Sequence, residues 1–493
     1  MTNTSRKQAG VLLPISALPG PYGAGDFGPA ARKAARLLAQ SLAGVWQILP
    51  LNPLGYGNSP YQPYSSYAGD PLYISLEDLY EKKLLRRLPP PFRRGAGRVD
   101  YPAVREYKEP FLREAFAHFV PDEEYRRFSE LAWVKNYAVF ITLKQKNGMR
   151  CWNEWPEAEK NWPQEHGLDL SPYAGEIAYQ TFLQYEFLRQ WRALKEYANS
   201  LGLKIMGDLP FYVGVDSLDV WAGRDQFLLD AEGAPTSVAG VPPDYFSPTG
   251  QRWGNPIYNW EKMEADGFSF WTDRLQYSGA LFDIVRIDHF RAFDTYWKIP
   301  ASCPTAVEGE WVEGPAYRFF DAVLPQLEGV EIVVEDLGEL RPEVYALRDH
   351  YRFKGMKIVQ FTFQPGRRED PSGDMENQIV YTGTHDNQTM LGWYRALSPV
   401  KRLGARRSLR MAGCRSGSIA QRFVRYALAH RAALAIIPAQ DILGLGDEGR
   451  INTPGTLGSP NWEWKLRDYG AFENMLPAFA KAVAETGRAR ESD

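Results

Sequence analysis

Cysteine is scarce in this sequence. The three cysteines, Cys151, Cys303 and Cys414, are widely separated and form no CxxC or Cys/His spacing. Structural zinc sites and disulfide frameworks depend on such spacings, so neither is expected. Scattered cysteines of this kind are typical of proteins in a reducing compartment, which predicts a cytoplasmic location.

Long apolar runs and a strong net charge are also missing. The apolar run at residues 11–15 is short and contains proline, and no uncharged apolar stretch reaches the length of a membrane span. The formal net charge is -3, and the basic run at residues 401–410 is local. This balance gives no general attraction to nucleic acid or to an anionic membrane, so neither partner is expected.

Aromatic residues, in contrast, are abundant. They make up 14% of the 493 residues and include 15 tryptophans and 27 tyrosines. Such a surplus suits a protein that stacks flat ligands such as sugar rings, but large aromatic core residues would produce the same composition. Composition leaves both interpretations open.

Eight short apolar segments alternate with helical patterns along the chain. They lie near residues 11, 46, 205, 284, 333, 359, 380 and 436, and several end in charged residues. Eight βα units with charge at the carboxyl ends of the strands are typical of an α/β fold, the TIM (β/α)8 barrel. The chain is longer than one compact core usually holds, so we expect a barrel with insertions.

The barrel pattern is interrupted after the second and third strands. Residues 76–201 have helical patterns without barrel strands, which predicts a helical insertion subdomain between two barrel parts, 1–75 and 202–493. A long aromatic loop near residues 215–260 follows the third strand and predicts a lid. Both insertions are expected to be largely helical.

Acidic residues follow several of the predicted strands. Arg286 and Asp288 share one face of a strand, since side chains of equal parity point the same way. Taken alone, this pair is either a structural ion pair or part of a site. Glu335 and Asp386 stand at the ends of two other strands, with Asp208 as a fourth acid. So much like charge on one barrel face favours a functional site.

Glycosidic bond chemistry needs two carboxylates with different pKa values. Arg286 would keep Asp288 ionised for attack, whereas the apolar approach to Glu335 would raise the pKa of Glu335 for acid and base work. A divalent metal site is the rival use of clustered acids, and the adjoining Arg286 and Arg291 argue against it. No metal or cofactor is therefore expected.

Several motifs narrow this interpretation to one family. Residues 207–210, 286–291, 335–338 and 384–387 resemble the four ordered motifs of the α-amylase superfamily. The chain further resembles the amylomaltases, or 4-α-glucanotransferases, in four segments: 57–61, 242–246, 250–256 and 450–455. Two departures, Asn58 and Gln388, stand where some members have Asp. The resemblance implies a barrel without a C-terminal β-sandwich domain.

The resemblance also implies roles for single residues. Asp288 would be the nucleophile, Glu335 the acid and base, and Asp386 the stabiliser of the transition state. Substrate-binding roles are implied for eight further residues: Tyr56, Ser59, Tyr61, Asp208, Trp253, Arg286, His289 and His385.

The implied reaction is retaining transfer of α-1,4-glucan segments by double displacement. Donors would be maltooligosaccharides and α-glucans derived from starch or glycogen, and the acceptor would be another glucan or glucose. A net α-glucan hydrolase and a non-catalytic glucan-binding barrel are the alternatives. Retention of all three acids, Asp288, Glu335 and Asp386, argues against the second alternative.

Overall fold

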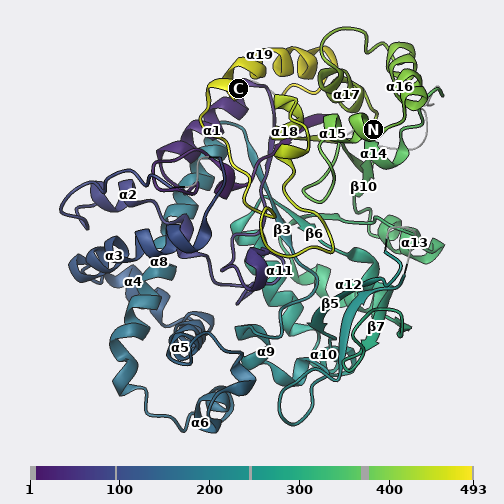
Figure 1. Ribbon diagram of the computed structural model, residues 1–493. Coiled ribbons are helices and arrows are strands. Elements are labelled where there is room, and N and C mark those ends of the chain that lie inside the picture. Colours follow the sequence, from purple (N-terminus) through teal and green to yellow (C-terminus); the bar gives the residue numbers. More distant parts are fainter. Residues whose placement is uncertain (1–6, 95–96, 244–246, 368–376, 491–493) are drawn as a thin grey trace.

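A parallel sheet of eight strands forms the centre of the protein, as seen in the computed structural model, which describes residues 7–94, 97–243, 247–367 and 377–490. The strand order is β10-β11-β12-β1-β2-β3-β6-β9 (Figure 1). The strands are β1 (Gln8–Leu12), β2 (Val45–Gln47), β3 (Lys204–Leu209), β6 (Ile284–Ile287), β9 (Glu331–Val334), β10 (Gly355–Ile358), β11 (Gln378–Tyr381) and β12 (Leu434–Pro438). All eight predicted strands are confirmed.

The two ends of this sheet meet and close the barrel. Val333 of β9 forms a parallel bridge with Lys354, and the Val334 N–H donates to the Lys354 carbonyl at 3.0 Å. One predicted boundary was wrong, because the apolar run at residues 357–363 is not a single strand. Its second half forms the short helix α14 (Val359–Thr362), where Phe361 is 62% exposed and so does not serve the core.

The strands read as continuous apolar runs because both of their faces are buried. One set of side chains fills the barrel interior, and it includes Leu12, Val45, Met206, Ile284, Val333, Met356, Ile379 and Leu434. The alternate residues face the surrounding helices and belong to the main core, for example Val11, Trp46, Ile205, Val285, Val334, Val380 and Ile437. Because side chains alternate between the two faces, every second residue of a strand points into the barrel, and the last such residues line the barrel mouth.

The chain between β2 and β3 is helical. Its helices are α2 (Leu76–Glu81), α3 (Tyr101–His118), α4 (Glu123–Ser129), α5 (Ala132–Lys146), α6 (Glu157–Lys160), α7 (Trp162–Glu165) and α8 (Ala174–Ser200). Arg105 of α3 ties this insertion to the loop after β2, since its guanidinium donates to both carboxylate oxygens of buried Asp70 at 2.7 and 2.6 Å. The helices lie to the left of the barrel in Figure 1.

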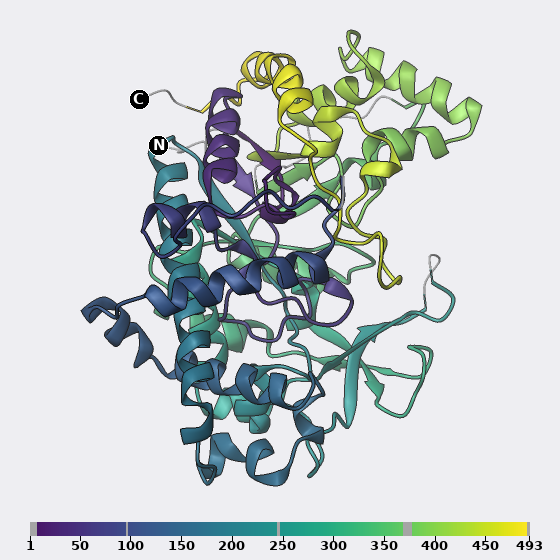
Figure 2. The same ribbon diagram turned by 60° about the vertical axis from the view of Figure 1, so that its left-hand side comes forward.

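The insertion after β3 is not largely helical, contrary to expectation. It contributes β4 (Ser237–Val241) and β5 (Gln251–Pro256) beside α9 (Leu218–Ala222), α10 (Trp260–Ala265) and α11 (Ser269–Leu281). These strands pair with β7 (Thr295–Pro300) and β8 (Glu310–Glu313), which follow β6, in an antiparallel sheet of order β5-β4-β7-β8. Figure 2 shows this sheet extending away from the barrel. Its Gly- and Pro-rich strands lack the alternation that would have revealed them.

Helices surround the remaining strands. They are α1 (Pro29–Gln40), α12 (Ala316–Val323), α13 (Pro342–His350), α15 (Met390–Ala396), α16 (Pro399–Met411), α17 (Ile419–Leu428), α18 (Ala439–Leu443) and α19 (Gly470–Glu485). From β12 to residue 490 the chain forms helices and loops without another strand. Across the described ranges, none of the helices combines the length and the apolar character that crossing a membrane requires.

Candidate active site

Arg286 stands at the centre of the site, between two carboxylates. In the pairing of β3 with β6, Asp208 lies opposite Arg286, so the sheet register alone brings these two side chains together. Arg286 Nη1 donates to Asp208 Oδ1 and Oδ2 at 2.7 and 2.8 Å and to Asp288 Oδ1 at 3.0 Å. The expected pair between Arg286 and Asp288 is present, but Arg286 also serves Asp208, which is fully buried.

Glu335 occupies the next strand end. Ile287 pairs with Val334, so Asp288 and Glu335 each follow one residue beyond the same register position. Glu335 Oε2 accepts a hydrogen bond from the His289 N–H at 2.8 Å, and Oε1 accepts one from the Leu337 N–H at 3.1 Å. His289 adopts a left-handed backbone conformation, with φ of 50°, at the turn that follows β6.

Burial raises the pKa values of both central acids. It raises the pKa of Glu335 to about 7, and the negative charge of Asp288 adds to this effect. Burial likewise raises the pKa of Asp288 to about 6, although the nearby Arg286 charge lowers it. Arg286 lowers the pKa of Asp288 as expected, but burial outweighs it and the charge of Asp208 adds to the rise. The pKa of Glu335 is raised by burial, as predicted.

Two rings from distant loops stack beside this charged centre. The Tyr61 hydroxyl donates to Asp208 Oδ2 at 2.7 Å and lies 3.4 Å from His385 Nδ1. The rings of Tyr61 and His385 stack with centroids 5.0 Å apart. The loop after β2 is thus joined to the loop after β11 through the site.

Asp386 is held by a part of the chain to which no role was assigned from sequence. Asn452 Nδ2 donates to Asp386 Oδ1 at 2.7 Å, and Arg450 Nη2 donates to the Asp386 carbonyl at 2.8 Å. Trp462 lies against both stacked rings, with centroids 5.7 Å from Tyr61 and 5.8 Å from His385. The only signal for Arg450 and Asn452 was the family-like motif at residues 450–455.

The remaining predicted residues lie at the edge of the site. Trp253 of β5 meets the His289 ring edge to face at 4.8 Å, and its carbonyl accepts from Gln62 Nε2 at 3.0 Å. Burial lowers the pKa of His289 to about 3, so this ring is neutral at neutral pH. Ser59 Oγ accepts from the Tyr61 N–H at 3.3 Å. The Tyr56 side chain and residues 244–246 lie outside the described part of the chain.

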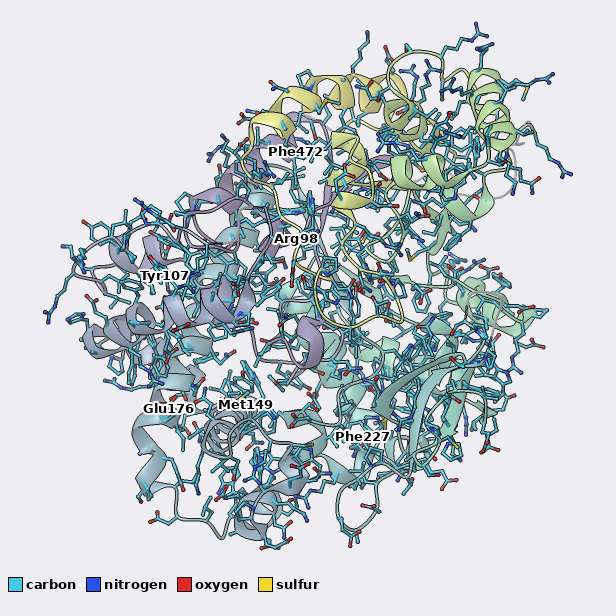
Figure 3. All side chains as sticks on the ribbon, in the orientation of Figure 1. Arg98, Tyr107, Met149, Glu176, Phe227 and Phe472 are labelled. Carbon is cyan, nitrogen blue, oxygen red and sulfur yellow. The ribbon has the colours of Figure 1, made fainter. Side chains whose placement is uncertain are left out.

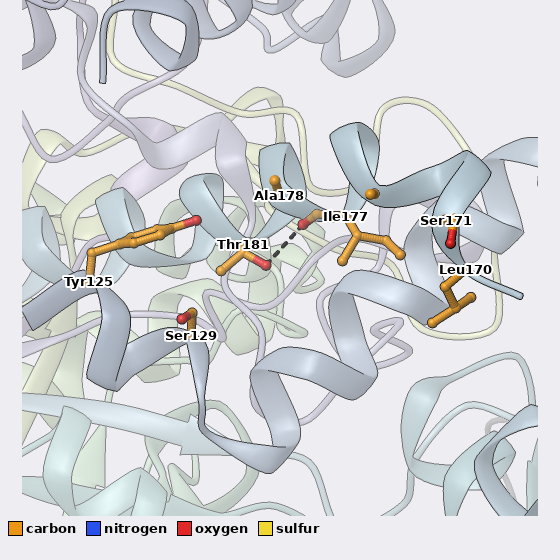
Figure 4. Close-up of a pocket in the computed structure, with 8 residues that line it drawn as sticks. Tyr125, Ser129, Leu170, Ser171, Ile177, Ala178 and Thr181 are labelled. Atoms are coloured by element: carbon orange, nitrogen blue, oxygen red, sulfur yellow. Dashed lines mark hydrogen bonds between the residues drawn. The ribbon is translucent and has the colours of Figure 1, made fainter. Parts of the chain in front are cut away.

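One pocket lies away from the barrel mouth. It has a volume of about 440 Å³ and lies within the helical insertion, against α4 and α8 (Figure 4). The wall contains small and apolar side chains, and Thr181 Oγ1 donates to the Ile177 carbonyl of its own helix at 2.9 Å. No Asp, Glu, His, Lys or Arg is among the residues that line it, so it offers no pair of carboxylates for glycosidic bond chemistry.

No group of three or more His, Cys, Asp or Glu side chains in the described ranges is arranged to hold a metal ion. The acids of the barrel mouth instead pair with Arg286 or accept hydrogen bonds from backbone and amide groups.

An eight-stranded barrel with an ionisable acid pair at adjacent strand ends defines a class of enzymes, the barrel glycosidases and transglycosylases that use carboxylates. Within this class, the chain belongs to the 4-alpha-glucanotransferase family, because the sequence model of that family matches residues 13–471.

Individual relatives span nearly the whole chain. A 4-alpha-glucanotransferase of Thermus thermophilus is 45% identical over 93% of this chain and 94% of its own length. One from Streptococcus pneumoniae is 40% identical over 97% of this chain and 96% of its own length. An amylomaltase from Streptococcus agalactiae, solved in complex with acarbose, superposes with a TM-score of 0.91 at 33% identity and covers 98% of this chain and all of its own.

Proposed function

We propose that this protein transfers segments of α-1,4-glucan from a donor to the 4-hydroxyl of an acceptor by a retaining double displacement. Donors are maltooligosaccharides and α-glucans derived from starch or glycogen, and glucose is the smallest acceptor. The proposal rests on membership of the 4-alpha-glucanotransferase family and on one observation. Arg286 lies between Asp208 and Asp288, and Glu335, whose pKa is raised by burial, occupies the neighbouring strand end.

In the first step, the ionised carboxylate of Asp288 attacks the anomeric carbon of the donor. A covalent bond from Asp288 to the sugar forms while the glycosidic C–O bond breaks. Glu335 enters this step protonated and gives its proton to the leaving 4-oxygen. The backbone N–H groups of His289 and Leu337 then stabilise the resulting Glu335 carboxylate, because each donates to one of its oxygens.

In the second step, the 4-hydroxyl of an acceptor attacks the same anomeric carbon. Glu335 takes the proton of that hydroxyl, a new glycosidic bond forms, and Asp288 leaves as a carboxylate. Two inversions give net retention. Asp386 stabilises positive charge that develops on the sugar ring in both steps. His385 and Tyr61 hold the sugar at the point of attack, and buried Asp208 orients the Tyr61 hydroxyl.

Transfer exceeds hydrolysis only if water is kept from the covalent intermediate. Trp253, from the insertion after β3, meets His289 directly beside Glu335. Gln62 connects Trp253 to the loop after β2. We propose that the contact between Trp253 and His289 holds an acceptor ring in the position that water would otherwise occupy.

The products formed from maltotriose test the reaction. A transferase yields a ladder of longer maltooligosaccharides together with glucose, and the number of reducing ends stays constant. A hydrolase shortens the substrate while reducing ends increase in step. Hydrolysis products would reject the transferase reaction but would not contradict the roles of Asp288 and Glu335.

Substitution of the nucleophile tests the assignment of Asp288. In Asp288→Asn, kcat should fall by roughly 10⁴- to 10⁶-fold, the scale of nucleophile loss in other covalent enzymes. Maltotriose binding, measured by calorimetry, should persist, since the amide keeps the shape of the side chain. Turnover near the wild-type rate would remove Asp288 from this role.

The cytoplasmic location stays a prediction from the sparse cysteines.

A further inference from the structure

We infer that Asn452 is a positioning residue for Asp386, and that the helical insertion supports it through the bridging segment, residues 450–464. This inference rests on the proposed function, in which Asp386 faces the reacting sugar. Figure 1 shows the yellow C-terminal chain descending from α18 in front of β3 and β6. The contact between Asn452 and Asp386 joins residues 66 positions apart.

Asp386 needs such support because no strand fixes it. Strand β11 ends at Tyr381, so Asp386 lies five residues beyond the sheet. Its side chain is 43% exposed, whereas that of Asp288 is 28% exposed and that of Asp208 is fully buried. A carboxylate in an exposed loop samples several rotamers unless neighbours restrain it.

The chemistry of the restraint suits a stabiliser of positive charge. Asn452 donates through a neutral amide at 2.7 Å, so it orients the Asp386 carboxylate without neutralising it. Arg286, in contrast, compensates the charges of Asp208 and Asp288. A cation in place of Asn452 would weaken the field that Asp386 exerts on a developing oxocarbenium ion. An amide positions the group and preserves its charge.

Backbone contacts fix Asn452 itself. Its N–H donates to the His385 carbonyl at 3.0 Å. The Arg450 guanidinium joins the two loops, since Nε donates to the Asn452 carbonyl at 2.7 Å and Nη2 to the Asp386 carbonyl at 2.8 Å. Asn452 is 9% exposed, so little water competes for its amide. The amide therefore has one well-defined direction, toward Asp386.

The helical insertion holds the other end of the bridging segment. The Trp462 N–H donates to the Ile451 carbonyl at 2.7 Å, and the Tyr101 hydroxyl, at the start of α3, donates to the Trp462 carbonyl at 2.7 Å. The Val99 N–H donates to the Glu463 carbonyl at 2.8 Å. Arg98, labelled in Figure 3 beside the C-terminal chain, donates from Nη1 to the Pro460 carbonyl at 3.3 Å. A continuous set of contacts thus runs from the insertion to Asp386.

The direct test is Asn452→Ala with maltotriose as substrate. We expect kcat to fall by about 10²-fold, the scale of a 1 Å misplacement of a reacting group, with KM little changed. The melting temperature should fall only slightly, because a single side-chain hydrogen bond to the partly exposed Asp386 is lost. Acarbose, which carries a cationic nitrogen, should lose more affinity than maltotriose when Asp386 is no longer oriented.

Two further variants separate positioning from a structural role. Asn452→Gln keeps an amide donor and should recover part of the lost kcat. Asn452→Asp replaces the donor with a like charge beside Asp386, so kcat should fall at least as far as in Asn452→Ala. No recovery of kcat in Asn452→Gln relative to Asn452→Asp would overturn the inference.

Ser459→Ala is the matched control in the same segment. Its hydroxyl donates to Glu463 Oε2 at 2.8 Å on the exposed side, away from Asp386, so wild-type kcat is expected. Tyr101→Phe should reduce kcat less than Asn452→Ala does. Wild-type kcat in Asn452→Ala, or a fall that matches a loss of melting temperature, would overturn the inference. Failure of wild-type protein to form the maltotriose ladder would instead reject the proposed function.

Discussion

Asp288 and Asp386 reach the same barrel mouth by different routes. Asp288 directly follows β6, and the Arg286 beside it is aligned with Asp208 by the register of two parallel strands. Asp386 lies in a loop and is oriented by Asn452, 66 residues further along the chain. We refer to these as the strand half and the loop half of the site.

The two halves also differ in charge. In the strand half, buried Asp208 and partly exposed Asp288 share the one buried guanidinium of Arg286, so loss of Arg286 leaves two neighbouring carboxylates without a counter-charge. In the loop half, the neutral amide of Asn452 orients Asp386, and a hydrogen bond to a charged group of this kind contributes about 1.5–3 kcal/mol. Substitutions in the strand half should therefore destabilise the barrel, whereas substitutions in the loop half should change the orientation of Asp386 without unfolding it.

The largest effect should come from the shared cation. Arg286→Met keeps the length of the side chain but leaves buried Asp208 and partly exposed Asp288 without a counter-charge. We expect the free energy of unfolding to fall by about 3–5 kcal/mol at neutral pH, with loss of measurable transfer. Urea titration followed by circular dichroism measures the first effect.

Lys204→Met provides the control for Arg286→Met. Lys204 lies on β3 and pairs with Glu331 at 3.1 Å, but its side chain is 51% exposed. Its loss should therefore cost less than about 1 kcal/mol. Equal destabilisation by the two substitutions would remove the distinction between buried and exposed pairs on which the strand half depends.

The pH dependence of kcat/KM should reflect the ionisation of Asp288 and Glu335, the two acids that follow strands β6 and β9. Asp288 must be ionised to attack, and its pKa is about 6, so kcat/KM should fall as the pH drops below about 6. Glu335 must be protonated, and its pKa is about 7, so kcat/KM should also fall as the pH rises above about 7. Each limb should approach a tenfold loss per pH unit. A profile that stays flat from pH 5 to 8 would contradict this assignment.

The smallest effect on rate, together with a change in the products, is expected at Trp253 of β5. Trp253→Ala removes the ring that meets His289, so water gains access to the covalent intermediate. We expect hydrolysis to rise several-fold relative to transfer, while total donor consumption changes little. Chromatography of maltotriose products, combined with a reducing-end assay, measures the ratio. An unchanged ratio would assign water exclusion to other residues.

Most of the barrel and its acids were predictable from sequence because the signals are local. A buried parallel strand appears as an apolar run, and a site at its carboxyl end appears as an abrupt change to charge. The antiparallel sheet was missed because β4 and β5 contain Gly240, Gly254 and Pro256 and a register shift near Gly240, which remove the alternating pattern. The segment at 357–363 failed for the opposite reason, since Phe361 is apolar yet exposed.

The sequence by itself therefore determined the barrel, the three acids Asp288, Glu335 and Asp386, and the family, because each depends on short segments. Tertiary structure alone decided how the positive charge of Arg286 is shared between Asp208 and Asp288. Arg286 serves Asp208 as well as Asp288 because sheet register places Asp208 opposite it. Asn452 meets Asp386 because the bridging segment folds back over the barrel, and no local pattern records a contact across 66 residues.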